Sequence, residues 1–219
     1  MFCTECGAKV NEDNKFCDNC GHQLIKDEAN VEAEKEKVKS SRRRYWDKFT
    51  EIYTSGDSDW KNKMISDSAW ELLNRFSGNL FVSFMEEHPI LNKHSHKEID
   101  SIKTEFNTAS GAGYYFWLAE QLFNGRDLQP PKPPDTDGLS KEWEKEKVFE
   151  DTKTFFANLP DDVSSSMNDF HAWRAKSLLE TSPALNDLPN ELIEEINNKL
   201  AILMLMGYSS GMVEDKYRK

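Results

Sequence analysis

A six-residue pattern, repeated near the start of the chain, constrains its fold more than any other feature. Residues 2–7 read Phe-Cys-Thr-Glu-Cys-Gly and residues 16–21 read Phe-Cys-Asp-Asn-Cys-Gly, so all four cysteines of the chain stand in two C-x-x-C pairs. The two-residue gap lets one tight turn direct both thiolates at a single ion, and two such turns complete a tetrahedron. The spacing therefore predicts one structural Zn²⁺ ion, and its four ligands are Cys3, Cys6, Cys17 and Cys20.

These paired turns resemble the short N-terminal zinc-ribbon domain of bacterial and archaeal proteins. The resemblance covers residues 1–25 and implies zinc binding by the four cysteines. Ribbons of this kind often carry a proline inside the knuckle, where this chain has Thr4 and Asp18, and this departure leaves the ligands in place. Because such ribbons are attached to many unrelated proteins, the resemblance implies a docking or stabilising module. It assigns no family to residues 45–219.

The predicted ribbon has very little apolar material of its own. Its large apolar side chains are Phe2, Val10, Phe16, Leu24 and Ile25. A core of this size does not fold a unit of this length without help. We therefore expect zinc to supply most of the folding free energy of residues 1–25, on the order of 10–16 kcal/mol. Since four thiolates already fill the tetrahedron, His22 is expected to be a surface residue and the site to have no open position for catalysis.

Charge is distributed unevenly along the chain. Residues 1–44 carry nine acidic and nine basic residues, whereas residues 45–219 carry thirty acidic and nineteen basic ones, which is the whole net charge of −11. Residues 26–44 are rich in Glu, Lys and Ala but have no apolar face. Such a segment favours a solvated helix over a packed one. The sequence thus predicts three parts: a zinc ribbon (1–25), a charged helical linker (26–44) and an α-helical domain (45–219).

Apolar residues recur at helical spacing throughout residues 45–219, without a convincing run of β alternation. The pattern predicts an all-α bundle of about six helices. The whole chain is therefore expected to be mainly α, with short β strands confined to the ribbon. One continuous helix is expected from Ser58 or Asp59 through the apolar run 80–85, which is expected to lie at the centre of the bundle. Gly78 is expected to kink it.

Other boundaries follow from capping and breaking residues. The sequence Ser95-His96-Lys97-Glu98 is a capping box that should open a long helix, which Asn124-Gly125 should end. Inside that helix, residues 110–113 read Ser-Gly-Ala-Gly, which indicates either a close helix crossing or a kink. A further helix is expected from Ser140 through Phe155 and Leu159, ending at Pro160. The last long helix is expected to end before Gly207, leaving residues 208–219 as a short polar tail or as one or two further turns of helix.

One segment concentrates basic charge. Residues 35–44 carry a net charge of +5 and are followed by Tyr45 and Trp46, whose rings offer stacking surfaces for bases. Nucleic-acid binding is therefore one hypothesis for this segment. The other is a solvated linker that contacts a partner or the acidic body. The second is favoured by the charge of the body, which repels phosphate at long range. The residues concerned are Lys35, Lys37, Lys39, Arg42, Arg43 and Arg44.

The helical domain offers few candidates for chemistry. His88, His94 and His96 cluster between two predicted helices, where they indicate either a second metal or catalytic site or ordinary loop histidines. No phosphate-binding glycine loop or nucleophile motif occurs, and no cysteine remains once zinc is bound. The sequence therefore predicts a protein that is not an enzyme, with an enzyme of unrecognised type in the helical body kept as an alternative.

Taken together, these features predict a zinc-binding adaptor or regulatory protein that acts through a protein partner, with the ribbon as its recognition module. Nucleic-acid binding by the ribbon and residues 35–44 is the alternative. No apolar run is long enough to span a bilayer, and the chain opens directly into the first C-x-x-C pair without a signal peptide. All cysteines serve in metal-binding pairs, which suits a reducing compartment. We therefore expect a cytoplasmic protein without membrane insertion.

Overall fold

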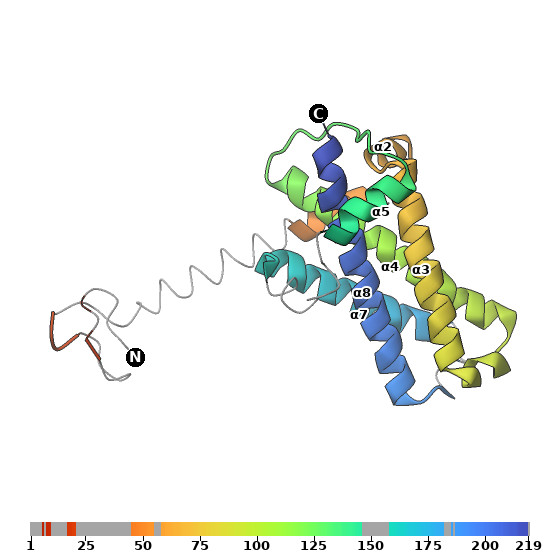
Figure 1. Cartoon of the computed structure of the whole chain (residues 1–219). Coiled ribbons are helices and arrows are strands. Elements are labelled where there is room, and N and C mark those ends of the chain that lie inside the picture. Colours follow the sequence, from red (N-terminus) through yellow and green to blue (C-terminus); the bar gives the residue numbers. More distant parts are fainter. Residues whose placement is uncertain are drawn as a thin grey trace. The chain divides into compact units, whose positions relative to one another are not determined.

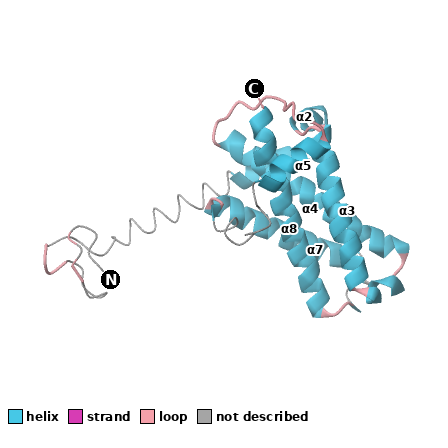
Figure 2. Ribbon diagram, viewed as in Figure 1, coloured by secondary structure: helices cyan, strands magenta, loops and turns pink. Residues whose placement is uncertain are grey.

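The structure is a computed structural model of the chain, and it describes residues 6, 8–9, 17–20, 45–54, 58–145, 158–181, 185 and 187–218. The chain divides into two compact units, Met1–Arg43 and Arg44–Lys219. The second unit consists of helices joined by loops, with no strand among its described residues (Figures 1 and 2). The predicted all-helical body is thus confirmed. Of the strands predicted for the ribbon, the described part includes one bridge residue, Lys9.

The helical body follows a simple order along the chain. Residues 45–54 are helical, and the elements after them are α2 (Ser58–Met64), α3 (Asp67–Glu87), η1 (Pro89–Lys93), α4 (His96–Phe123), α5 (Thr136–Lys145), α7 (Asp161–Thr181), α8 (Asn190–Glu214) and η3 (Asp215–Tyr217). A single core of buried aromatic and aliphatic side chains runs through these elements.

The start of α4 is set by the predicted capping box. The Ser95 hydroxyl accepts a hydrogen bond from the Glu98 amide at 3.4 Å, and the Glu98 carboxylate accepts one from the Ser95 amide at 2.8 Å. This reciprocal pair satisfies two of the amide groups that a helix N-terminus leaves without partners. The other end of α4 is also as predicted, with Gly125 in the left-handed region at φ 76° just beyond it.

The continuous helix predicted from residue 58 is wrong, because the chain breaks between α2 and α3. Ser66 caps α3 by accepting a hydrogen bond from the Ala69 amide at 3.1 Å, and its own amide donates to Glu214 at 3.1 Å. The apolar run 80–85 is not central either, since Val82 is 54% exposed. Gly78 lies inside α3, which is assigned as one helix from Asp67 to Glu87, and has open space around it; the kink at Gly78 stays a prediction.

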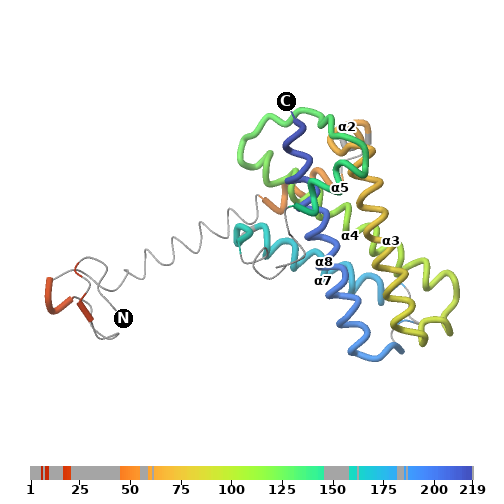
Figure 3. Tube along the Cα trace, in the orientation of Figure 1, coloured from red at the N-terminus to blue at the C-terminus, as the bar shows by residue number. Residues whose placement is uncertain are grey.

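The centre of the body is a close crossing of α4 and α8, the helix pair with the most extensive contact (Figure 3). A Cβ atom built at Gly113 would lie 1.8 Å from the Met204 carbonyl oxygen, and one at Gly207 would lie 1.9 Å from the Ser110 carbonyl oxygen. Backbones this close leave no room for a side chain. Of the two predicted explanations for residues 110–113, the crossing is therefore correct.

The crossing also explains why the predicted end of the last helix is wrong. Gly207 allows α4 to lie close to α8 and does not end the helix, so α8 continues to Glu214. Residues 208–214 are largely buried instead of forming a polar tail, and Glu214 is fully buried. A Cβ atom at Gly211 would meet the Trp117 indole at 2.6 Å, so this part of α8 also packs closely on α4.

A buried polar network holds the C-terminal end of α8 to the start of the body. Tyr114 donates a hydrogen bond to the Glu214 carboxylate. Arg218 donates to the Met64 carbonyl at 2.5 Å and to the Tyr114 hydroxyl at 2.7 Å, and its guanidinium lies 5.1 Å from the centre of the Trp117 ring. These contacts join α2, α4 and the end of α8 at one point and give Glu214 and Arg218 polar partners, although the buried Arg218 Nε atom has none among the described residues.

Helix α5 begins earlier than predicted, at Thr136 instead of Ser140. The reason is that the Asp135 side chain accepts a hydrogen bond from the Gly138 amide at 2.9 Å and so caps the helix. Thr136 also donates to Glu71 on α3 at 2.7 Å, which fixes the first turn of α5 against its neighbour. The predicted continuation of this helix through Phe155 lies outside the described residues.

Candidate zinc site and aromatic groove

Three of the four predicted zinc ligands come together in the first unit. One sulfur atom each from Cys6, Cys17 and Cys20 lies within 4.8 Å of the others, and the Cys6 and Cys17 sulfurs are 3.6 Å apart. Thiolates bound to one tetrahedral zinc at about 2.3 Å are separated by roughly 3.8 Å. The separation observed is close to this value, so the described cysteines fit a zinc ion. Cys3 lies outside the described residues.

The electrostatics around Cys6 favour the form that binds metal. The Asn19 side-chain amide donates to the Cys6 sulfur at 3.5 Å. This bond, the backbone amide of Ala8 and contacts from the other cysteines lower the pKa of the Cys6 thiol to about 6. Zinc binds the thiolate and not the thiol, so at neutral pH less proton release is needed to load the site.

The contact between Asn19 and a ligand sulfur is a feature of the site that the sequence did not predict. As a knuckle residue Asn19 is expected to be exposed and to influence partner choice without touching the metal; it is exposed, but it also contacts the Cys6 sulfur. Residues 18–20 form the turn that follows Cys17, and this turn brings the Asn19 amide back over Cys6. The available signal was its position inside the second C-x-x-C gap.

The predicted basic contact segment stays a prediction. Its residues, which are Lys35, Lys37, Lys39, Arg42, Arg43 and Arg44, lie outside the described part of the chain. The structure does correct the expectation for the aromatic residues that follow them. Tyr45 is completely buried and donates a hydrogen bond to the Phe116 carbonyl at 2.8 Å, so its ring cannot stack on a base. Trp46 is half-buried and lines a groove.

This groove, which we call the aromatic groove, lies between the helix at residues 45–54 and α7. Its volume is about 260 Å³, and its lining residues are Trp46, Phe49, Thr50, Tyr53, Thr54, Phe170 and Trp173. Ring contacts hold its floor in place: the centroids of Phe49 and Tyr53 lie 5.3 Å from that of Phe170 in edge-to-face arrangements. At its edge Trp173 is 54% exposed.

No lining residue of the aromatic groove carries a charge. Arg174, which follows Trp173 in the sequence, lies with its guanidinium 5.4 Å from the centre of the Trp173 ring. The same guanidinium forms two hydrogen bonds with the Glu105 carboxylate, one of them 2.7 Å long. Its charge is thus compensated within the protein. The aromatic groove is therefore suited to an apolar group rather than to an anion.

The three clustered histidines do not form a joint site. His94 pairs with Glu98 at 3.6 Å, and His96 is exposed in the first turn of α4. His88 instead faces α8, where its Nε2 atom lies 3.0 Å from a Glu195 carboxylate oxygen. Each histidine thus has different neighbours, and among the described residues no group that could hold one metal ion contains more than one of the three.

Comparison with known proteins supports the assignment of the first unit. A family model described as a zinc-ribbon domain matches residues 2–24, which confirms the resemblance seen in the sequence. No curated protein and no solved structure matches the chain. No family is recognised for the helical body, as expected. Within the described ranges, no helix is both long enough and apolar enough to cross a membrane.

Proposed function

We propose that this protein is a zinc-binding adaptor that acts through protein–protein interaction, with its ribbon as the recognition module. The observation that supports this is the clustering of Cys6, Cys17 and Cys20 around an exposed turn, residues 18–20, in a unit of its own. One structural zinc, with Cys3 as its fourth ligand, would hold this turn in a single conformation. A preorganised turn loses less entropy when a partner binds to it.

The helical body provides a second docking surface in this proposal. The aromatic groove offers aromatic walls and an exposed Trp173. Protein interfaces are typically anchored by an apolar or aromatic side chain that enters such a pocket. We therefore propose that the groove receives an apolar side chain of the protein partner. No catalytic step is part of the proposed function.

The uncharged lining favours a protein partner over a nucleic acid. Phosphate binding needs cations that are available to the ligand. Arg174 is already engaged by Glu105, and Tyr45 is buried. The nucleic-acid hypothesis therefore depends on residues 35–44 and Trp46.

Affinity capture with the tagged full-length chain tests the proposal when it is done with two variants. Cys3→Ser/Cys6→Ser removes the zinc site, and Trp173→Ala removes the exposed side of the aromatic groove. We expect specific proteins that bind the zinc-loaded wild type to be lost with the cysteine variant and reduced with Trp173→Ala. Thermal unfolding of each variant serves as the control, because the helical body should remain folded in both.

Two results would contradict the proposal. The first is recovery of the same partners in equal yield from a folded Cys3→Ser/Cys6→Ser variant, which would exclude the ribbon from recognition. The second is loss of all partners after nuclease treatment, together with binding of RNA or DNA by the purified protein at low salt. Binding that is then lost in an Arg42→Ala/Arg43→Ala/Arg44→Ala variant would establish the nucleic-acid hypothesis instead.

A further inference from the structure

The C-terminal end of α3 carries an unusual excess of negative charge. Glu86 and Glu87 stand in its last turn, which contains no basic residue, although the carbonyl groups of a helix C-terminus already favour cations there. Glu195 of α8 approaches the same point. The Lys199 ammonium lies 3.5 Å from a carboxylate oxygen of Glu87 and 3.5 Å from one of Glu195. One ammonium against two carboxylates leaves a negative charge uncompensated.

His88 adds a nitrogen ligand to this point. It is the C-cap of α3, and its ring lies against Phe84 with 4.9 Å between the ring centroids. Its Nε2 atom is buried and makes an ion-pair contact of 3.0 Å with a Glu195 carboxylate oxygen. A buried ring nitrogen that faces a carboxylate in this way is placed so that both groups can bind one metal ion.

We propose that Glu87, His88 and Glu195 form a second metal site, distinct from the ribbon, that binds a divalent transition metal such as Zn²⁺. One ligand atom from each residue lies within 4.8 Å of the others. Ligands bound to a tetrahedral zinc at about 2.1 Å are roughly 3.4 Å apart, so the three groups need only small side-chain rotations to bind one ion. The imidazole favours zinc over magnesium or calcium. Three protein ligands leave a fourth position for water.

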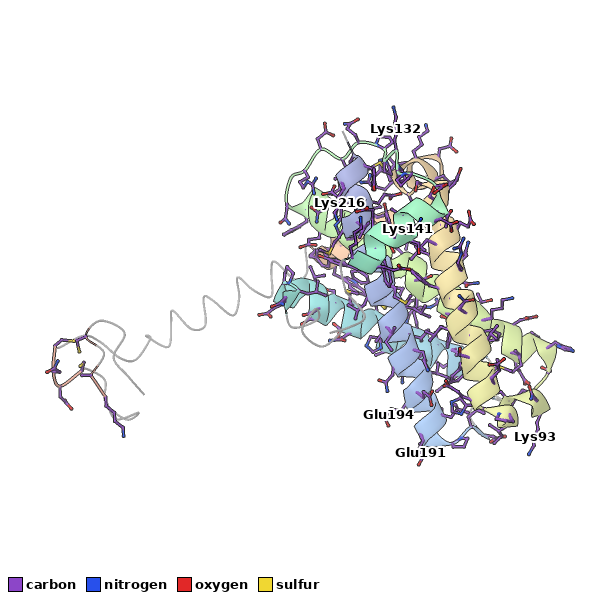
Figure 4. The ribbon with its side chains drawn as sticks, in the orientation of Figure 1. Lys93, Lys132, Lys141, Glu191, Glu194 and Lys216 are labelled. Carbon is purple, nitrogen blue, oxygen red and sulfur yellow. The ribbon has the colours of Figure 1, made fainter. Side chains whose placement is uncertain are left out.

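The site would join the end of α3 to the first half of α8, and both lie at the lower end of the body in Figures 1 and 4. Glu191 and Glu194 of α8 are labelled at this end and are exposed, so they add to the negative potential that attracts a cation. This inference does not depend on the proposed function, because none of its residues belongs to the ribbon or the aromatic groove.

Lys199 gives the proposal a distinctive consequence. Its ammonium occupies the space between Glu87 and Glu195 where the ion would bind, so the two cations compete. Replacing Lys199 by an uncharged residue of similar length should therefore strengthen metal binding. A merely structural ion-pair cluster would bind no metal in either form of the protein.

Cobalt titration of the full-length protein, with its ribbon already loaded with zinc, tests the proposal. Co²⁺ at the proposed site would give weak visible bands without the intense near-ultraviolet absorption of cobalt thiolates, which separates it from exchange into the ribbon. We expect one further equivalent to bind and to be displaced by Zn²⁺. Glu195→Gln keeps the shape of the side chain but removes a ligand. Loss of a group that only hydrogen-bonds to a ligand weakens metal binding by about 10- to 100-fold, so Glu195→Gln should weaken cobalt binding by more than this.

Matched variants complete the test. Glu194→Gln removes an exposed carboxylate one residue away and should leave the cobalt affinity nearly unchanged, whereas Lys199→Met should increase it. His88→Ala should abolish the second equivalent, and its thermal unfolding without added metal shows whether the body remains folded. The proposal is overturned if the wild type binds no second equivalent, if Glu195→Gln and Glu194→Gln bind cobalt equally, or if Lys199→Met fails to bind more tightly.

Discussion

Asn19 shows how one side chain can tune a metal ligand without binding the metal. Its amide donates a hydrogen bond to the Cys6 sulfur, and this bond is the largest cause of the lowered pKa of that thiol. Without this bond the thiolate would be less stable, and protons would compete more strongly with zinc. The Asn19 contact therefore favours the thiolate form of Cys6, the form that binds zinc, from a position between two cysteines in the sequence.

We predict that Asn19→Ala weakens zinc binding near neutral pH by about 10- to 100-fold, the range typical of partners that hydrogen-bond to ligands. Competition with a chelator of known affinity measures this change. Lys9→Ala, an exposed substitution in the same unit, is the control and should bind zinc as the wild type does. Equal affinities of the two variants would show that the Asn19 contact does not stabilise the thiolate.

Glu214 gives a prediction about how stability depends on pH, and its pKa is shifted in the opposite direction to that of Cys6. Burial raises the pKa of its carboxyl above the ordinary value of 4.5, although Ser66 and Arg218 act in the other direction. The folded state therefore binds this proton more tightly than the unfolded state. Its contribution to the free energy of unfolding is complete below pH 4.5 and is lost as pH rises through the pKa of the folded state.

Glu214→Gln removes this titration and keeps most of the hydrogen-bonding shape. We predict that the stability of the wild type relative to Glu214→Gln falls as pH rises from about 4.5 to 7, because only the wild type then carries a buried carboxylate. Urea unfolding of both proteins across this range measures the difference. A relative stability that increases with pH would mean that the Arg218 pair outweighs the cost of burying the charge.

At the scale of the elements, the crossing of α4 and α8 controls the architecture. Alanine at Gly113 would place its Cβ against the Met204 backbone, which cannot move aside as a flexible side chain could. We predict that Gly113→Ala destabilises the body by at least about 1–3 kcal/mol. Denaturant unfolding measures this loss.

Gly78→Ala is the matched control for that experiment. Gly78 lies inside α3 with nothing within 4 Å of a built Cβ atom, so alanine there should stabilise the helix by about 0.5–1 kcal/mol. If Gly113→Ala lowers the free energy of unfolding and Gly78→Ala raises it, the glycines of α4 and α8 are required for the close crossing of the two helices. A neutral Gly113→Ala would contradict the close approach of the two backbones.

Local signals predicted some elements well and others poorly, for a physical reason. The Ser95–Glu98 capping box and the turn at Gly125 depend on nearby residues, and both were correctly predicted. Gly207 was not, because a glycine suits both a helix end and a helix crossing, and only the position of α4 decides between them. Glu214 was assigned to a polar tail because its partners, Ser66 and Tyr114, are distant in the sequence.

The same distinction applies to sites in the molecule as a whole. The cysteine cluster was predictable because the spacing of two short pairs encodes it, and three of its members are confirmed to lie together. The grouping of His88 with Glu195 was not predictable, since it arises from the packing of α3 against α8. The aromatic groove likewise depends on α7 lying beside residues 45–54, although the aromatic residues themselves were evident in the sequence.

The whole-molecule account depends on the separation of a zinc-dependent ribbon from a helical body that folds on its own core. The structure divides the chain at residues 43 and 44, and the buried core of the second unit is extensive. If the ribbon acts as a recognition module, its folding should depend on zinc while the body is unaffected. Removal of the metal is therefore expected to change a small, defined part of the chain.

Chelation of zinc, followed by hydrogen exchange and far-ultraviolet circular dichroism, tests this separation most directly. We predict that amides within residues 1–25 lose their protection, while the helical signal and the protection of α4 and α8 persist. Restoring zinc should restore the protection of the ribbon. Loss of the helical signal on chelation, or an unchanged ribbon after the metal has been removed, would contradict the account.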